Sequence, residues 1–133
     1  MYNILILDDE YSVRSILELT LKKNGFKTCS IESVDRALEL EDTSLAPIST
    51  ANLIISDFEM FDKTAMDLLK YLDENNLNIP VIIHSGYINA EKEIKNSKYK
   101  NSVLHFISKP ATKNDILTVI NDFFGGKRSY TKN

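Results

Sequence analysis

The stretch ILILDDE, residues 4–10, decides the fold of this chain. Four consecutive aliphatic residues run directly into three acidic ones. A short, continuous apolar run with polar boundaries is typical of a strand that is buried on both faces of a parallel sheet. Such a sheet carries helices on both faces and binds ligands outside the carboxyl ends of its strands. The stretch therefore predicts an α/β protein with acidic chemistry at the end of its first strand.

The rest of the chain repeats this pattern of strand followed by helix. Further strands are predicted at residues 27–31, 53–55, 81–83 and 103–107, the first of them as an edge strand. Apolar residues at helical spacing predict helices at residues 12–23, 33–40, 64–75 and 114–124, and a short, marginal helix within 89–100. Residues 41–52, which contain a proline, are expected to form a loop. Five alternations predict right-handed crossovers in one sheet covered on both faces.

Several local predictions refine these elements. Ser33 and Thr64 are candidate N-caps, and Gly25 is a candidate helix stop. Ile16 falls on the face of the first helix that is expected to meet the core, together with its neighbours at helical spacing. The pair Gly125-Gly126 is expected to end the last helix, before a polar tail. His84 and His105 are expected to be strand residues that face polar gaps.

Composition limits the classes of function. A chain of 133 residues fits one domain, and its formal net charge of -3 argues against a broad electrostatic grip on nucleic acid or anionic lipid. A single cysteine, Cys29, rules out an intrachain disulfide. No apolar run approaches the roughly 20 residues that a membrane span requires, and no leader pattern follows Met1. These features predict a cytoplasmic protein without membrane insertion or direct contact with nucleic acid.

Candidate functional residues follow the predicted strands. Asp8-Asp9 follows the first strand, Ser56-Asp57 the third, His84-Ser85 the fourth and Ser108-Lys109-Pro110 the fifth. Three carboxylates gathered at one edge repel one another, and a divalent cation such as Mg²⁺, which prefers oxygen ligands, relieves that repulsion. A carboxylate can accept a phosphoryl group, a transfer that depends on positioning and charge neutralisation. Asp57, on a central strand, is the natural nucleophile.

Together these residues resemble the receiver domain of bacterial two-component response regulators. The resemblance rests on residues 4–10, Asp57, Ser85 and Lys109-Pro110, in that order and at matching separations, and it covers about residues 2–124. It implies a flavodoxin-like, doubly wound parallel sheet of five strands in the order 2-1-3-4-5. The expected organisation is a receiver domain at residues 1–125 and a polar tail at 126–133.

The resemblance also implies the chemistry of the site. Asp57 is expected to accept a phosphoryl group, and Lys109 to form an ion pair with it. Magnesium is expected to be bound by Asp57, directly by Asp9, through water by Asp8, and by the backbone carbonyl of Glu59. The phosphoryl donor would be a sensor histidine kinase or a histidine phosphotransfer protein. The chain would catalyse its own phosphorylation and slow dephosphorylation, without turnover of a separate substrate.

Two further residues are expected to act as the switch. By resemblance, the Ser85 hydroxyl moves toward the phosphoryl group and the Phe106 ring turns inward behind it. The surface of the fourth helix, fifth strand and fifth helix then changes and is read by a downstream protein target. A phosphorylation-dependent dimer is compatible with this scheme.

The sequence departs from the family pattern after the acceptor. Met60 is followed by Phe61 rather than proline, and Thr64-Ala65 stands in place of Asp-Gly. The loop before the third strand is longer than usual, and residues 98–102 lack the usual Gly-Ala. These departures leave two alternatives open. One is a receiver-like interaction module that works without phosphorylation. The other is a phosphatase of the haloacid dehalogenase type, which the order of the acids and the absence of a cap domain disfavour.

Overall fold

The computed structural model describes residues 2–131, with side chains as far as residue 125. One parallel sheet has the strand order β2-β1-β3-β4-β5, as the resemblance predicts. The strands are β1 (Asn3–Leu7), β2 (Lys27–Ile31), β3 (Leu53–Ser56), β4 (Val81–Ser85) and β5 (Val103–Ser108). The helices are α1 (Tyr11–Lys23), α2 (Val34–Glu41), α3 (Ala65–Glu74), α4 (Ala90–Lys95) and α5 (Lys113–Thr131), with a short 3-10 helix, η1 (Lys100–Ser102).

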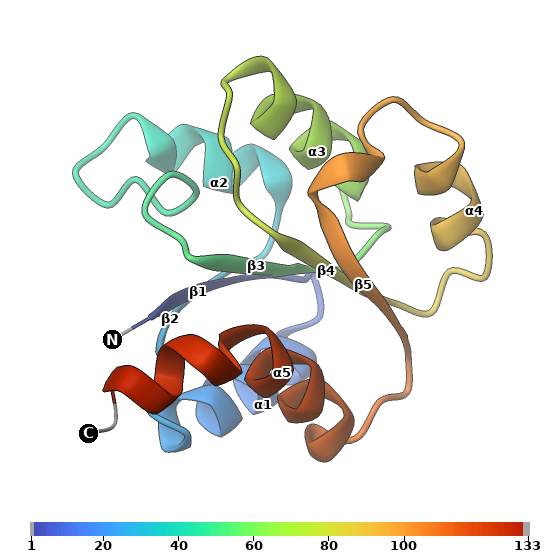
Figure 1. Ribbon diagram of the computed structural model, residues 1–133. Coiled ribbons are helices and arrows are strands. Elements are labelled where there is room, and N and C mark those ends of the chain that lie inside the picture. The colour runs from blue at the N-terminus through green and yellow to red at the C-terminus, as the bar shows by residue number, and fades with distance from the viewer. Residues whose placement is uncertain (1, 132–133) are drawn as a thin grey trace.

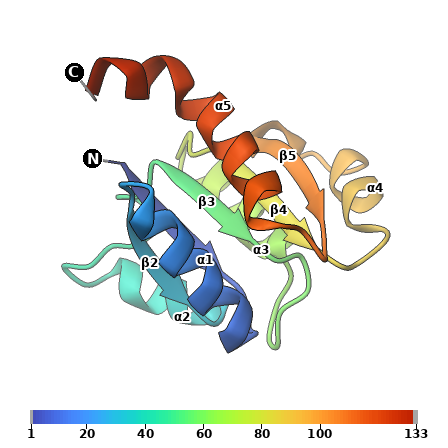
Figure 2. The same ribbon diagram turned by 90° about the horizontal axis from the view of Figure 1, so that it is seen from below.

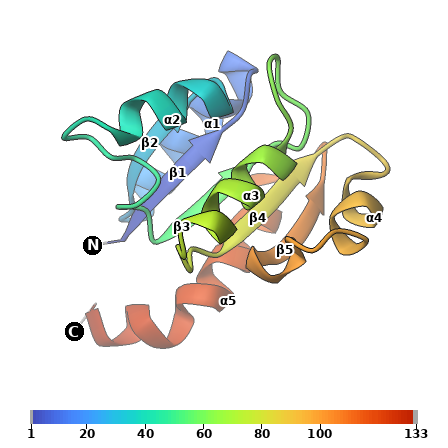
Figure 3. The same ribbon diagram turned by 90° about the horizontal axis from the view of Figure 1, so that it is seen from above.

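The helices cover both faces of the sheet. Figure 1 shows α2, α3 and α4 on one face and α1 and α5 on the other. Viewed from below, α1 and α5 lie across the sheet, and viewed from above, α2, α3 and α4 do (Figures 2 and 3). Because side chains alternate along a strand, each apolar run supplies both layers. Leu5 and Leu7 of β1 face the α2–α3–α4 side, whereas Ile4 and Ile6 face the α1–α5 side.

Local sequence signals account for where the helices begin and end. The Ser33 hydroxyl accepts the backbone N–H of Arg36 at the start of α2. Thr64 begins α3 with a capping box: its hydroxyl accepts the N–H of Met66, and the Asp67 carboxylate accepts the N–H of Thr64. Gly25, with a φ of 89°, takes the left-handed conformation that ends α1. These three local predictions are confirmed.

The fourth helix is short, as its composition predicts. It has six residues, of which only Ala90 and Ile94 are buried. A helix of this length gains little from its own hydrogen bonds, so the contacts of these two residues with the core hold it in place. None of the helices in the described part of the chain is long and apolar enough to cross a membrane.

Three sequence predictions are wrong: the end of the last helix, the burial of Ile16 and the surroundings of His84. Gly125-Gly126 does not end the last helix, because α5 continues to Thr131. A glycine pair weakens a helix but stops it only where a residue takes the left-handed conformation. Residues 132–133 of the predicted tail lie outside the described residues. Ile16 also does not join the core: it is 53% exposed, since α1 turns only a narrower stripe toward the sheet.

His84 occupies an apolar position rather than a polar gap. It lies two residues after Ile82 on β4 and so points to the same face of the sheet, toward α1 and α5. The side chain is 5% exposed, and neither ring nitrogen has a hydrogen-bond partner among the described residues. Burial lowers the pKa of His84 to about 4, and the nearby charge of Lys109 adds to the effect, while Asp57 and Glu10 oppose it. His105, by contrast, is exposed.

We expect Thr64→Ala to lower the free energy of unfolding by about 1 kcal/mol, because the variant loses one half of the capping box. Urea unfolding followed by circular dichroism measures the change. Thr118→Ala is the matched control, since Thr118 lies inside α5 and its hydroxyl donates to the Asn114 carbonyl. Alanine is the better helix former there, so the control should be no less stable than wild type. Equal losses in both variants would contradict a specific role for the cap.

We expect His84 to make the protein sensitive to mild acid. Between pH 6.5 and about 4 the unfolded chain takes a proton on His84 while the folded chain does not, so stability falls as the pH falls. His84→Leu should remove this pH dependence. The free energy of unfolding of the variant, relative to wild type, should therefore rise by about 2 kcal/mol as the pH falls from about 7 to about 5. Urea unfolding at several pH values measures the difference. His105→Leu is the control and should show the same pH dependence as wild type. A stability difference between His84→Leu and wild type that does not change with pH would show that His84 is not the source of the acid sensitivity.

Candidate functional site

Strand register brings the predicted site residues to one edge of the sheet. Leu7 of β1 pairs with Ser56 of β3, so the residues that follow them, Asp8 and Asp57, lie side by side. Ser85 of β4 pairs with Ser108 of β5, which places Lys109 on the same edge. The Asp57 N–H donates to the Leu7 carbonyl at 2.8 Å, and the Lys109 N–H donates to the Ser85 carbonyl at 2.9 Å. Backbone hydrogen bonds thus continue the sheet into the site.

The Lys109 ammonium joins the first, third and fifth strands. Its Nζ lies 2.8 Å from Asp8 Oδ2 and 2.9 Å from Asp57 Oδ2. A longer contact of 3.5 Å reaches Glu10 Oε1. Asp8 and Asp57 are 101 and 52 residues away from Lys109 in sequence, so only folding brings the three side chains into contact. The convergence of Asp8, Asp57 and Lys109 that the sequence predicts is therefore present.

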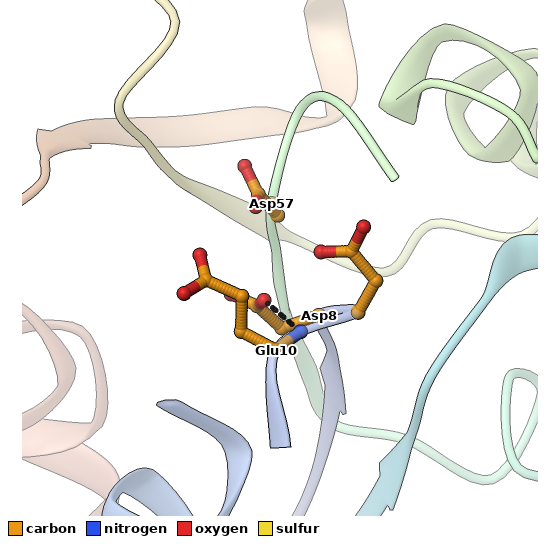
Figure 4. A group of neighbouring side chains, drawn as sticks. Asp8, Glu10 and Asp57 are labelled. Atoms are coloured by element: carbon orange, nitrogen blue, oxygen red, sulfur yellow. Dashed lines mark hydrogen bonds between the residues drawn. The ribbon is translucent and has the colours of Figure 1, made fainter. Parts of the chain in front are cut away.

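Four carboxylates gather at this edge of the sheet. Asp8, Asp9, Glu10 and Asp57 each offer an oxygen, and these oxygens all lie within 4.8 Å of one another. Asp8 and Asp57 are buried, whereas Asp9 and Glu10 are exposed. Figure 4 shows Asp8 and Glu10 on the turn after β1, close to Asp57 at the end of β3, with the Glu10 N–H bonded to Asp8 Oδ1 at 2.9 Å. The cluster holds more negative charge than one ammonium can offset.

The protonation of the buried pair reflects its surroundings. Burial raises the pKa of Asp8 above its ordinary value, although the bonds from Lys109 and the Glu10 amide offset part of the shift. Burial alone would lower the pKa of Lys109, but the hydrogen bonds to Asp8 and Asp57 outweigh it and raise the pKa above its usual range. The lysine is therefore a fixed positive charge at any physiological pH.

Asp57 is held in a defined orientation. Its Oδ1 accepts the backbone N–H of Phe58 at 2.7 Å, while Oδ2 accepts from Lys109. The side chain of Phe58 is buried and stacks on Tyr87, with ring centroids 5.3 Å apart. Tyr87 is half-buried. The carboxylate is therefore held by one backbone and one side-chain donor.

Ser85 lies at the end of β4, on the same edge. It is 7% exposed, and its Oγ accepts the N–H of Tyr87 at 3.1 Å. Because this contact uses a lone pair, the hydroxyl proton can be donated to a group that enters the site. The Lys109–Pro110 peptide bond next to it is cis.

The unusual loop after β3 is held by its own contacts. Glu59 and Thr64 form an antiparallel bridge, and the Met60 N–H donates to the Lys63 carbonyl at 3.0 Å. At the start of α2, the N–H of Asp35 donates to Asp62 Oδ2 at 3.2 Å, and Lys63 Nζ lies 3.2 Å from Asp35 Oδ1. These contacts connect the loop to α2 without a proline. Phe61, at the tip, is 93% exposed.

The remaining predicted residues lie where the sequence suggests. Glu59 is exposed at the start of this loop, outside the cluster of acidic side chains. Its role as a carbonyl ligand stays a prediction. Phe106 is half-buried in β5 and packs against the core on the α2–α3–α4 side. Lys95 of α4 places its ammonium 5.8 Å from the centre of the Phe106 ring. A switching role for Ser85 and Phe106 also stays a prediction.

Sequence reasoning missed three features of the site. Glu10 joins the acidic cluster, and its position directly after Asp8-Asp9 was the available signal. Arg14, one helical turn further on, donates to the Asp8 carbonyl at 2.7 Å. The stack of Phe58 on Tyr87 had no signal in the sequence, because it joins residues on two different strand ends.

Comparisons with known proteins agree with this geometry. Residues 4–121 match the family model of the response regulator receiver domain. The transcriptional regulatory protein FixJ of Rhizobium meliloti is 29% identical over 109 residues, which is 82% of this chain and 50% of FixJ. The cell cycle transcriptional regulator CtrA of Caulobacter vibrioides is 26% identical over 117 residues, 88% of this chain and 48% of CtrA. The chain thus spans about half the length of these curated relatives.

Solved structures share the fold. A receiver domain protein from Clostridium thermocellum superposes with a TM-score of 0.77 at 22% identity, covering 98% of this chain and 99% of that one. The response regulator TrrA from Thermotoga maritima, solved in complex with Mg²⁺ and BeF, has a TM-score of 0.72 at 17% identity, covering 92% and 98%. Since the family model matches most of the chain, this protein belongs to the response regulator receiver domain family of two-component signalling systems.

Proposed function

We propose that Asp57 accepts a phosphoryl group from a phosphohistidine on a partner protein, and that the modified chain signals through its α4–β5–α5 surface. The observation that carries this proposal is the contact of the Lys109 ammonium with both Asp8 and Asp57. A lysine in this position holds the acceptor carboxylate in place and supplies positive charge where a phosphoryl oxygen would arrive.

The transfer is a substitution at phosphorus. An oxygen of the Asp57 carboxylate forms the new O–P bond as the N–P bond of the phosphohistidine breaks, and the imidazole leaves with the electron pair and takes up a proton. The product is an aspartyl phosphate. Lys109 neutralises charge on the phosphoryl oxygens, and the Ser85 hydroxyl can donate to one of them. The protein provides position and charge, which is what this reaction requires.

The acidic cluster fits a magnesium ion. Its donors are carboxylate oxygens, which Mg²⁺ prefers, and the two exposed acids leave room for the waters that Mg²⁺ retains. We propose Asp8, Asp9 and Asp57 as its protein ligands, together with the Glu59 carbonyl. When bound, the ion would offset the excess negative charge of the cluster and of the phosphoryl group.

The proposed output begins at Ser85 and Phe106. Phosphorylation adds a charge of about −1.5 to −2 next to the Ser85 hydroxyl. A shift of Ser85 toward this charge would free space behind it for the Phe106 ring. That ring now lies below the ammonium of Lys95 on α4. A partner that binds the two positions differently would read the change. We propose a sensor histidine kinase or phosphotransfer protein as donor, a downstream protein as target, and a cytoplasmic location.

Two other functions predict different results. A receiver-like module that works without phosphorylation would not need the Lys109 contact with Asp57. A phosphatase of the haloacid dehalogenase type would turn over a generic phosphomonoester. We expect no such turnover, since receiver domains do not act on a separate substrate.

We expect acetyl phosphate with Mg²⁺ to add one phosphoryl group to the protein, and Asp57→Asn to abolish the addition, because an amide cannot act as the nucleophile. Intact-protein mass spectrometry measures the gain. Asp73→Asn, which changes an exposed acid on α3, is the matched control and should be modified like wild type. Omission of Mg²⁺ should suppress the reaction. A wild-type protein that gains no mass would favour the module that works without phosphate.

We propose that the Tyr87 ring, which stacks on Phe58 next to Asp57, shields the phosphoryl group from water. We therefore expect Tyr87→Ala to shorten the lifetime of the phosphorylated protein several-fold. Decay of the phosphorylated form after removal of acetyl phosphate measures the lifetime. Ile88→Ala is the control, since Ile88 lies on the same loop and is 91% exposed. An unchanged decay rate in Tyr87→Ala would dismiss the shielding role.

A further inference from the structure

The most exposed large apolar side chains lie at the edge of the sheet that carries Asp57. Within the described part of the chain, Phe61 is 93% exposed and Ile88 is 91% exposed. Phe61 belongs to the loop after β3, and Ile88 to the loop after β4. In Figures 2 and 3 the loop after β3 projects beyond the strand ends, next to the turn between β1 and α1. Large apolar groups left in water beside a functional site are characteristic of an interaction surface.

Phe61 also lines a hollow whose other walls are mainly acidic. The hollow has a volume of about 490 Å³ and lies between the turn after β1, the start of α2 and the loop after β3. Besides Phe61, its lining residues are Asp9, Glu32, Ser33 and Asp62. Three of them carry carboxylates, and none is a lysine or an arginine. The hollow therefore places an uncovered aromatic ring beside negative charge that no lining residue offsets.

Two cations near the hollow are engaged elsewhere. Lys63, on the same loop as Phe61, has its ammonium 3.2 Å from Asp35 Oδ1. The Lys109 ammonium is bound to Asp8 and Asp57. A positive group supplied by another molecule would therefore find carboxylates in the hollow that these two lysines do not already pair with.

The sign of this charge decides what can occupy the hollow. Nucleic acid and anionic lipid are negatively charged and would be repelled. A second copy of this chain that used the same edge would bring two acidic clusters together. A cationic side chain, by contrast, is attracted both by carboxylates and by the face of an aromatic ring. Arginine fits best, because its planar guanidinium can stack on the Phe61 ring while it donates to a carboxylate.

Asp9 connects the hollow to the proposed phosphoryl acceptor. It lines the hollow, and one of its carboxylate oxygens lies within 4.8 Å of an oxygen of Asp57. A protein that brings a phosphohistidine to Asp57 therefore covers the hollow at the same time. The occupant that both the charge and the location favour is an arginine of the phosphoryl donor.

We propose that Phe61 and the hollow beside it dock an arginine side chain of the protein that donates the phosphoryl group. The inference rests on the function proposed for Asp57 and adds to it a residue that selects the donor. Phe61 stands where the family pattern has proline, which offers no aromatic face. The contact would therefore distinguish this chain from receivers that follow the common pattern.

The test uses synthetic phosphohistidine peptides as donors to the full chain in the presence of Mg²⁺. Each peptide carries one phosphorylated histidine, a glycine spacer of varied length and either arginine or citrulline, which has nearly the same shape without the charge. Intact-protein mass spectrometry follows the transfer of the phosphoryl group from the imidazole to Asp57. At low peptide concentration and at the best spacer length, we expect the arginine peptide to react about fivefold faster than its citrulline counterpart, as an exposed ion pair with a ring contact should provide.

The ratio of the two rates isolates the docking contact, because a change in the chemistry at Asp57 affects both peptides equally. Phe61→Ala should bring the ratio close to one, and Glu32→Gln should lower it. Leu45→Ala and Glu74→Gln are the matched controls: Leu45 is 50% exposed, Glu74 ends α3, and neither lines the hollow. Both controls should keep the wild-type ratio.

Acetyl phosphate, which has no arginine to dock, separates the two proposals. A wild-type chain that gains a phosphoryl group from acetyl phosphate, but reacts equally with both peptides at every spacer length or with neither, would overturn the docking site alone. A ratio that persists in Phe61→Ala would overturn it as well. No mass gain from any of these donors would instead overturn the function proposed for Asp57, and the docking site with it.

Discussion

The structure depends on one contact, the Lys109 ammonium held between the carboxylates of Asp8 and Asp57. The three side chains come from the ends of β1, β3 and β5, so the contact fixes the carboxyl edge of the sheet. Buried charges are costly unless they are paired, and each member of this group needs the others. The same arrangement leaves the Asp57 carboxylate oriented and next to a permanent positive charge.

Different residues lie near this contact on the two faces of the sheet. On the α2–α3–α4 side, Phe58, the residue after the acceptor, stacks on Tyr87, and Phe106 lies under the Lys95 ammonium. On the α1–α5 side, Lys109 and His84 both line a cavity between α1 and α5.

The loop after β3 departs from the family pattern in sequence, and contacts within the chain hold it in place. Its sequence lacks the proline that would stiffen the turn, yet the bridge between Glu59 and Thr64 closes it. Its contacts with Asp35 then attach it to α2. A rigid loop matters because the backbone next to Asp57 forms part of the proposed metal site. Phe61 is left exposed at the tip, on the same rim as the acids.

The sequence by itself determined the strands, most helix boundaries and the N-caps at Ser33 and Thr64, because apolar periodicity and capping are local properties. It also put Asp8, Asp57 and Lys109 after predicted strands, whose carboxyl ends share one edge of a parallel sheet. Their roles in the site stay predictions. The predicted end of α5 at Gly125-Gly126 was wrong, since a glycine pair only weakens a helix. Tertiary structure alone decided the exposure of Ile16, the unpaired burial of His84 and the stack of Phe58 on Tyr87. Each depends on how two helices or two strand ends lie against each other, which no local pattern encodes.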